Sequence, residues 1–450
     1  MLQYSEGGAA VAKRIKYMCL LIALVVLLAG CTVRTMEEMY RLPKRSEDYN
    51  DLQAAIDSAM SGLDYSAPLT GENQQTVQLA DLDGDGENEY LLFAKGSQEK
   101  PLRILVFRNI EDTFVNTNTI ECNGSFFDQV EYVNMDDRGG VELVVGRQLN
   151  DQVIRSVSVY SLADGEITQL VSVNYTKFLT ADLDGDDLAE LFLLRPGQTE
   201  TDNGVAELYS MKNGAMERYN EVNLSQPADK LKRIIVGKLN GGKTAVYVAS
   251  AVGDTALMTD VYTLIDQKLA NVTLSNESGT SIQTMRNFYV YADDIDNDGE
   301  VELPSLINMQ PLAGMIDADM HHLIRWYAMT PTGVEIDKMH TYHNFVGGWY
   351  MQLDSQLAPR LVVLNLGNQT EFLLWDETYR TTEKIMTVFT FTGQSRNEQG
   401  LTQDRFVLHK TDFVVYAALL EDAASDYGFT QESVVYSFRM IQQDWKTGET

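Results

Sequence analysis

The chain has 450 residues and is strongly acidic, with 65 aspartates and glutamates against 35 lysines and arginines and a formal net charge of −30 at pH 7. This balance argues against nucleic-acid binding, because proteins that bind nucleic acids present basic patches to the phosphates. It also argues against electrostatic attraction to anionic lipid headgroups. The length suits one large β fold as well as two domains.

Residues 1–30 have the organisation of a signal peptide. Three basic residues between positions 13 and 16 precede an apolar stretch over residues 17–28, which is too short to span a bilayer because a span needs about 20 apolar residues. The stretch ends in Leu28-Ala29-Gly30-Cys31, which resembles the lipobox of bacterial lipoproteins. The resemblance implies that Cys31 carries lipid after cleavage and anchors an extracytoplasmic protein to the bacterial membrane. A plain cleaved signal or an uncleaved anchor is the alternative.

Cleavage would also change the charge and the cysteine count. It would remove one acidic and three basic residues and bring the net charge to −32. Cys19 lies in the signal and Cys31 would carry lipid, which leaves Cys122 alone. An intrachain disulfide is then excluded, although export would permit one. We therefore expect stability to come from packing and from metal that compensates part of the charge.

Residues 31–47 are predicted to be a polar tether, because they have no apolar period and contain Pro43. Residues 48–75 are predicted to be a short amphipathic helix that ends at Gly62, followed by a lead-in segment. The apolar residues of this helix have the spacing of one helix face: Leu52, Ala55, Ile56, Ala59 and Met60.

Residues 76–420 are predicted to be all-β. Short segments rich in β-branched, aromatic and leucine residues alternate with Gly, Asn and Asp turns. The clearest of these segments are 76–79, 90–93, 102–107, 157–160, 191–194, 245–249, 361–364 and 372–375. Residues 421–450 are predicted to be a helical tail packed on this body, with Thr430 as the N-cap.

A nine-residue acidic frame recurs six times in the β region. Its first positions, which define frames one to six, are Asp81, Asn134, Asp182, Lys238, Asp294 and Gln352. Positions 2 and 10 are apolar in all six frames, and a chance acidic cluster would not preserve both. The frames are therefore copies of one structural unit of about 50 residues, a length that fits a four-stranded propeller blade.

Frames one, three and five have the pattern of a calcium loop, with carboxylates at positions 1, 3, 5 and 9. Ca²⁺ takes about six to eight oxygen ligands, and alternate acidic residues on a tight loop aim their oxygens at one point, with a backbone carbonyl near position 7. We expect up to three structural Ca²⁺ ions, with frame one the surest site. The candidate ligands are Asp81, Asp83, Asp85, Glu87, Glu89, Asp182, Asp184, Asp186, Leu188, Glu190, Asp294, Asp296, Asp298, Glu300 and Glu302.

The other three frames contain cations in the place of ligands: Arg138 in frame two, Lys238 in frame four and Arg360 in frame six. We expect no metal there. One interpretation is that each cation replaces the ion with an internal salt bridge. The alternative is simple loss of constraint in a surface loop.

The loop D-x-D-x-D-G-x-x-[DE] and its period resemble the FG-GAP/VCBS-type repeats of integrin α-chain propellers and bacterial surface proteins. The resemblance implies a calcium-binding β-propeller. We expect seven blades, because residues 385–391, 405–409 and 413–418 offer further strands that the residues before Asp81 could complete; six blades is the alternative. An EF-hand is less compatible, because its loop needs an acidic ligand at position 12, where this chain has Leu92, Leu194 and Ser305.

The predicted function is a binding or scaffolding module for a surface protein or a glycan. The sequence shows no catalytic motif, and we do not expect an enzyme; a carbohydrate-active or other hydrolytic propeller with carboxylates in a channel or cleft is the alternative. Residues 237–244 match the spacing of a phosphate-binding P-loop, but a β-like run follows where that motif needs a helix. We therefore expect no nucleotide. We expect Trp326 and Trp349 to pack in the core.

Overall fold

The computed structural model describes residues 47–149, 154–199, 201–309 and 323–441. The predicted signal peptide, the predicted lipidation site Cys31 and nearly all of the predicted tether lie outside the described residues. Contacts divide the chain into two compact units. One contains the first helix and residues 109–115, and the other contains the body of all the sheets described below.

The predicted N-terminal helix is confirmed as α3 (Glu47–Ala59). Leu52 and Ile56, two residues of its predicted apolar face, are buried. Within the described ranges, no helix has the length and hydropathy needed to cross a bilayer.

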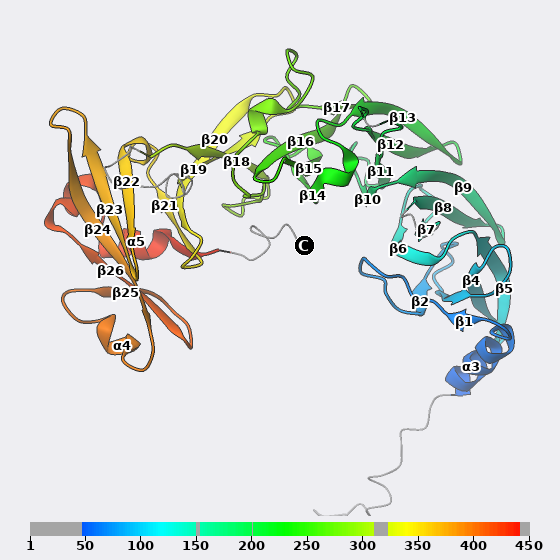
Figure 1. Cartoon of the computed structure of the whole chain (residues 1–450). Coiled ribbons are helices and arrows are strands. Elements are labelled where there is room, and N and C mark those ends of the chain that lie inside the picture. The colour runs from blue at the N-terminus through cyan, green and yellow to red at the C-terminus, as the bar shows by residue number, and fades with distance from the viewer. Residues whose placement is uncertain (1–46, 150–153, 200, 310–322, 442–450) are drawn as a thin grey trace, which may run out of the picture. The chain divides into compact units, whose positions relative to one another are not determined.

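The predicted all-β body is confirmed as six antiparallel sheets (Figure 1). The first sheet contains β1 (Asp64–Tyr65), β2 (Val77–Ala80), β3 (Glu89–Lys95), β4 (Leu102–Ile110) and β5 (Thr113–Cys122). The second contains β6 (Phe126–Val133), β7 (Glu142–Gln148), β8 (Arg155–Ala163) and β9 (Glu166–Tyr175). The third contains β10 (Lys177–Ala181), β11 (Glu190–Arg195), β12 (Val205–Lys212) and β13 (Ala215–Asn223).

The remaining three sheets follow in chain order. The fourth contains β14 (Leu231–Lys238), β15 (Thr244–Val252), β16 (Ala256–Ile265) and β17 (Lys268–Asn271). The fifth contains β18 (Glu302–Ile307), β19 (Leu323–Met329), β20 (Glu335–Asn344), β21 (Trp349–Leu353) and β27 (Phe438–Met440). The sixth contains β22 (Leu361–Leu366), β23 (Gln369–Asp376), β24 (Thr381–Thr392), β25 (Phe406–Lys410) and β26 (Val414–Leu420).

Short helices complete the described chain. The single-turn 3-10 segments are η1 (Ala228–Lys230), η2 (Ile282–Thr284) and η4 (Ala358–Arg360), and a longer one is η5 (Asp422–Tyr427). The α-helical segments are α4 (Arg396–Gln399) and α5 (Gln431–Ser437). As predicted, Thr430 is the N-cap of α5, where its side chain accepts a hydrogen bond from the Ser433 backbone N–H.

Consecutive sheets share apolar cores, and the strands that follow frames two, three and four, β7, β11 and β15, each contribute to two of them. In β11, Leu191 and Leu193 pack with residues of the second sheet, whereas Phe192 and Leu194 pack with residues of the fourth. This alternation follows from the two-residue period of a strand. β11 is covered on both faces and accordingly contains an uninterrupted apolar run, Leu-Phe-Leu-Leu. β13 is exposed on one face, and its sequence alternates between polar and apolar residues.

The same arrangement repeats at the other junctions. The cores between neighbouring sheets include Leu91, Phe93, Leu143 and Val145 for the first and second, Ala245, Tyr247, Leu303 and Tyr327 for the fourth and fifth, and Trp349, Met351, Leu361 and Val363 for the fifth and sixth. Trp326 and Trp349 are fully buried, which confirms their predicted core packing.

The expectation of a seventh blade is wrong in its assignment of strands. The segments 385–391, 405–409 and 413–418 lie in β24, β25 and β26, which belong to the sixth sheet together with β22 and β23. The residues before Asp81 pair as β1 and β2 with β3 of the first sheet, and not with the C-terminal strands. The described residues therefore form six sheets.

The C-terminal tail is only partly helical. After α5 the chain extends as β27, which pairs with β21 of the fifth sheet. Val434 and Phe438 are buried in the core between the fifth and sixth sheets. The predicted packing of the tail is thus confirmed, and its last described segment is a strand.

Candidate metal centres

Four of the six frames are hairpin loops with one shared register. The residue before position 1 pairs with position 9 in frames one, two, three and five: Ala80 with Glu89, Val133 with Glu142, Ala181 with Glu190, and Asp293 with Glu302. Frame four is one residue shorter, since Gly237 pairs with Ala245. Frame six differs more, because it connects β21 of the fifth sheet to β22 of the sixth. The prediction that all six frames are the same unit is therefore wrong for frame six.

The buried glutamate at position 9 stabilises each of the four loops by a hydrogen bond to the loop backbone. One carboxylate oxygen accepts the backbone N–H of position 2, at 2.8 Å for Glu89, 2.9 Å for Glu142, 2.8 Å for Glu190 and 3.1 Å for Glu302. All four glutamates are buried, as is the apolar residue at position 2 of every frame. The second carboxylate oxygen is thereby held under the loop.

The aspartate at position 1 also stabilises the loop, because its carboxylate accepts hydrogen bonds from backbone N–H groups later in the loop. Asp81 accepts N–H bonds from positions 4 and 6, Gly84 at 2.7 Å and Gly86 at 3.0 Å, and Asp182 accepts from the same two positions, whereas Asp294 accepts from positions 5 and 6. Position 6 has a positive φ in all three intact frames, 89° at Gly86, 69° at Asp187 and 88° at Gly299. Asp187 thus adopts the left-handed conformation that aspartate tolerates better than most residues.

Three groups of carboxylates converge in these loops. Their oxygen atoms lie within 4.8 Å of one another in each group, and the groups are Asp81, Asp83 and Asp85; Asp182, Asp184 and Glu190; and Asp294, Asp296 and Glu302. Each group could hold a metal ion, and oxygen-only donors suit a hard cation. The groups do not include the side chains at position 7, Glu87, Leu188 and Glu300, nor Glu89, Asp186 and Asp298.

The carboxylates of frames three and five repel one another. Burial, followed by the neighbouring aspartates, raises the pKa of Glu190 to about 7 and that of Glu302 to about 8. Burial and the next aspartate also raise the pKa values of Asp184 and Asp296. In addition, Oε1 of Glu302 is buried without a hydrogen-bond partner. A bound cation would remove both the repulsion and the unmet oxygen.

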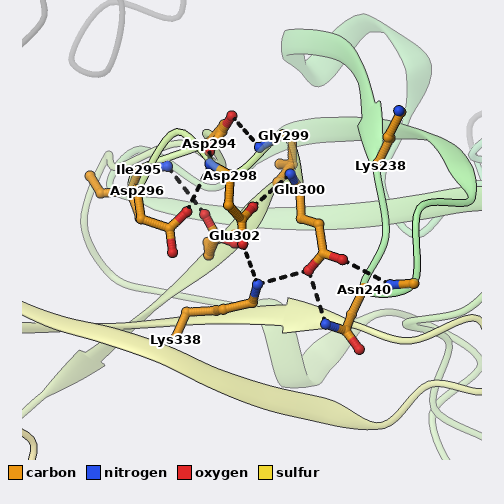
Figure 2. Close-up of polar contacts among 12 residues, drawn as sticks. Lys238, Asn240, Asp294, Ile295, Asp296, Asp298, Gly299, Glu300, Glu302 and Lys338 are labelled. Carbon is orange, nitrogen blue, oxygen red and sulfur yellow. Dashed lines mark hydrogen bonds and ion pairs between the residues drawn. The ribbon is translucent and has the colours of Figure 1, made fainter.

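Two basic residues contact the intact frames, and sequence reasoning missed both. In frame one, the Arg108 guanidinium lies 2.7 Å from Asp83 and 2.6 Å from Asp85. In frame five, the Lys338 ammonium lies 2.6 Å from Asp298 and 2.8 Å from Glu300 (Figure 2). Arg108 comes from β4 and Lys338 from β20, so no spacing within the frame indicates them. For frame three, no ion pair is present among the described residues.

The interpretation that cations replace the ion in frames two, four and six fits only frame two. Arg138 lies 2.6 Å from Asp136 and 3.4 Å from Glu142, and it donates to Ser161 at 2.7 Å. Lys238 points away from the carboxylates of frame five (Figure 2). Arg360 donates instead to the backbone carbonyl of Trp375 at 3.2 Å.

Backbone hydrogen bonds link neighbouring frames. The N–H of position 8 donates to the carbonyl of position 1 in the preceding frame, from Val141 to Asp81 at 3.1 Å, from Ala189 to Asn134 at 2.8 Å and from Val301 to Lys238 at 2.9 Å. Frame four also reaches frame five through Asn240 and Gly241, which donate to the Glu300 carboxylate at 2.9 and 2.8 Å (Figure 2). The loops therefore belong to the junctions between sheets.

The P-loop-like segment 237–244 has the structure that the β-like run predicted. It forms the turn between β14 and β15, and a strand follows it where a P-loop would continue as a helix.

The chain matches no protein-family model and no curated protein. Similar solved structures include the exotype rhamnogalacturonan lyase YesX, at 14% identity over 74% of this chain and 70% of that one, with a TM-score of 0.31. Others are rhamnogalacturonan lyase YesW, at 13% identity over 68% and 58% with a TM-score of 0.30, and Saccharomyces cerevisiae Sqt1, at 9% over 75% and 85% with a TM-score of 0.27.

Proposed function

We propose that this protein is a calcium-stabilised β-propeller-type repeat protein of the FG-GAP/VCBS kind, which acts as a binding or scaffolding module. The observation that carries the proposal is the convergence of two aspartates on a buried glutamate in frames three and five, where Oε1 of Glu302 is buried without a hydrogen-bond partner. A loop that only turned the chain in solvent would not need a buried carboxylate, because burying a charge without compensation is costly.

Calcium suits these loops better than softer metals. The candidate donors of frames three and five are carboxylate oxygens alone, with neither cysteine nor histidine among them, and such donors favour Ca²⁺ or Mg²⁺ over zinc or copper. Ca²⁺ accepts more ligands and more irregular geometry than Mg²⁺, which needs a near-ideal octahedron. The ion in each loop is structural: it neutralises carboxylates at the junction between two sheets.

In the proposed binding role, the sheets form a scaffold outside the cell, and the loops at the ends of their strands form the binding surface. The lipid anchor at Cys31 would hold the body at the bacterial membrane, and loops at the ends of the strands would contact a surface protein or a glycan. Loops carried on a rigid scaffold are the usual place for such contacts.

Calorimetric titration of the EDTA-treated protein with CaCl₂ tests the metal part of the proposal. We expect saturable binding and a rise in melting temperature. Asp184→Asn and Asp296→Asn should each remove one ion, while Asp254→Asn, in an exposed turn between β15 and β16, should remove none. Absence of calcium binding, with a melting temperature that EDTA leaves unchanged, would refute the proposal.

A further inference from the structure

Frame one has the best calcium pattern in the sequence, yet its carboxylates already have a cation. Arg108 lies 2.7 Å from Asp83, 2.6 Å from Asp85 and 3.1 Å from Glu89. These are positions 3, 5 and 9, three of the four acidic ligands that a calcium ion would use there. Contacts of this length are charge-assisted hydrogen bonds, the stronger kind.

Frames three and five are different in this respect. Lys338 contacts positions 5 and 7 of frame five, Asp298 and Glu300, and leaves Asp294, Asp296 and Glu302 grouped together. Frame three has no ion pair among the described residues. Both frames therefore keep an anionic group at positions 1, 3 and 9, whereas in frame one the position 9 glutamate is already paired.

A guanidinium and a calcium ion cannot share the ligands of frame one. Calcium needs its oxygens at about 2.3 to 2.6 Å, and the Arg108 nitrogens stand against the same oxygens. The two cations would also repel each other strongly at such short separation. Calcium could bind only if the Arg108 side chain moved away from the loop. This movement would break three ion pairs and leave a buried carboxylate oxygen of Glu89 without its ion-pair partner.

Frame two shows the same solution with a different arginine. The guanidinium of Arg138 contacts Asp136 and Glu142, positions 3 and 9 of that frame. The two frames are neighbours, joined by the hydrogen bond from Val141 to Asp81. At the junction of the first two sheets, the acidic loops are therefore neutralised by two arginine side chains, Arg108 and Arg138, which lie in different strands and loops of the chain.

We infer that Arg108 is the permanent counter-ion of frame one, so that this loop excludes calcium and the protein binds Ca²⁺ in frames three and five only. The inference rests on the proposed function for those two frames. Arg108 acts here as a specificity-determining residue: it decides which of three similar loops takes metal.

The test is a calcium titration of the full chain, with the number of bound ions read by calorimetry and by metal analysis after gel filtration. We expect two ions for the wild type and two for Asp81→Asn, which alters frame one alone. Arg108→Gln should gain a third ion, and Arg108→Gln combined with Asp81→Asn should lose it again. Arg103→Gln, on the same strand and paired with Glu121 at 2.9 Å, is the matched control and should keep two.

The outcomes separate the two proposals. A wild type that binds no calcium overturns the proposed metal function and the inference with it. A wild type from which Asp81→Asn removes an ion overturns the inference alone, and this variant needs no change at Arg108. A folded Arg108→Gln that gains no ion also overturns it.

Discussion

The loops of the first two sheets and those of the third and fifth solve one electrostatic problem in two ways. Each places a buried glutamate beneath surface aspartates, in the same register. Frames one and two balance this charge with Arg108 and Arg138, whereas the carboxylates grouped in frames three and five form no ion pair with any described residue. An acidic loop motif of this kind therefore needs a counter-ion to neutralise its carboxylates. The motif alone does not determine whether that counter-ion is a metal ion or a basic side chain.

Removing calcium should produce the largest difference between the two regions. An ion present at about 100 times its dissociation constant stabilises the folded state by about 2.7 kcal/mol, so loss of two ions should lower the melting temperature markedly. Hydrogen exchange followed by mass spectrometry should then show faster exchange in β10–β11 and β18, with little change in β2–β3 and β6–β7. Uniform loosening of all these strands would contradict a division between metal-held and arginine-held loops.

Neutralising the two arginines should have the next largest effect. Arg108→Gln and Arg138→Gln should each cost about 1 to 2 kcal/mol of unfolding free energy in EDTA, because each leaves a buried carboxylate oxygen without its ion pair and both arginines are partly exposed. Calcium should restore Arg108→Gln, since that frame keeps all its carboxylates. Calcium should not restore the stability of Arg138→Gln, because frame two has no carboxylate at position 5.

Arg138→Asp places a carboxylate at position 5 of frame two and should therefore create calcium binding there. Denaturant unfolding with and without calcium measures all three variants. Equal rescue of Arg108→Gln and Arg138→Gln would show that the two arginines do not act through the metal ligands.

The pH dependence of the metal-free protein should distinguish the same loops. The pKa values of Glu190 and Glu302 are raised from 4.5 to about 7 and about 8, so between these limits the folded state holds protons that the unfolded state has lost. This contribution to stability is complete below about pH 4.5 and is lost as the pH rises through 7 and 8. In EDTA, the melting temperature should therefore fall between about pH 4.5 and pH 8 and level off above this range.

Two controls belong with the pH measurement. Calcium should suppress the fall, because the ion stabilises the ionised carboxylates. The double variant Glu190→Gln and Glu302→Gln should flatten it in EDTA. A fall that persists unchanged in that variant would assign the pH dependence to other groups.

The smallest expected effect concerns Lys338. Replacing it with methionine should raise the calcium affinity of frame five by a few-fold, because a partly exposed ion pair is worth about 0.2 to 1 kcal/mol and its loss releases the Asp298 carboxylate for the ion. Lys384→Met, which removes a similar lysine paired with Glu371 and Glu421, should leave the affinity unchanged. Weaker binding in Lys338→Met would mean that the lysine supports the site.

Spacing along the chain predicted the hairpin loops well, and for a physical reason. The acidic positions, the turn residues and the apolar residues on either side all lie within about ten residues, so local geometry determines them. The strand segments were predicted equally well, since β3, β11 and β15 carry apolar runs that only burial on both faces explains.

What sequence reasoning missed depends on contacts between distant segments. Arg108 and Lys338 reach their frames across neighbouring strands, and nothing in their own surroundings indicates a carboxylate partner. The assignment of β24 to β26 to a seventh sheet failed for a similar reason: strand order in a sheet depends on which edges meet, and the pattern of a single strand does not contain that information.

Pro359 bears on the order in which the chain can finish folding. It occupies position 8 of frame six, where other frames donate a backbone N–H to the preceding loop, and proline has none. Instead, β27 completes the fifth sheet by pairing with β21, where the N–H of Ile441 donates to Gly348 at 2.9 Å, and Phe438 of β27 packs against Tyr416 of the sixth sheet. The edge of β21 thus remains open during synthesis until residues 438–441 emerge, and an open edge is a template for misassembly. A chain ending before residue 438 should consequently aggregate even though every acidic frame is present.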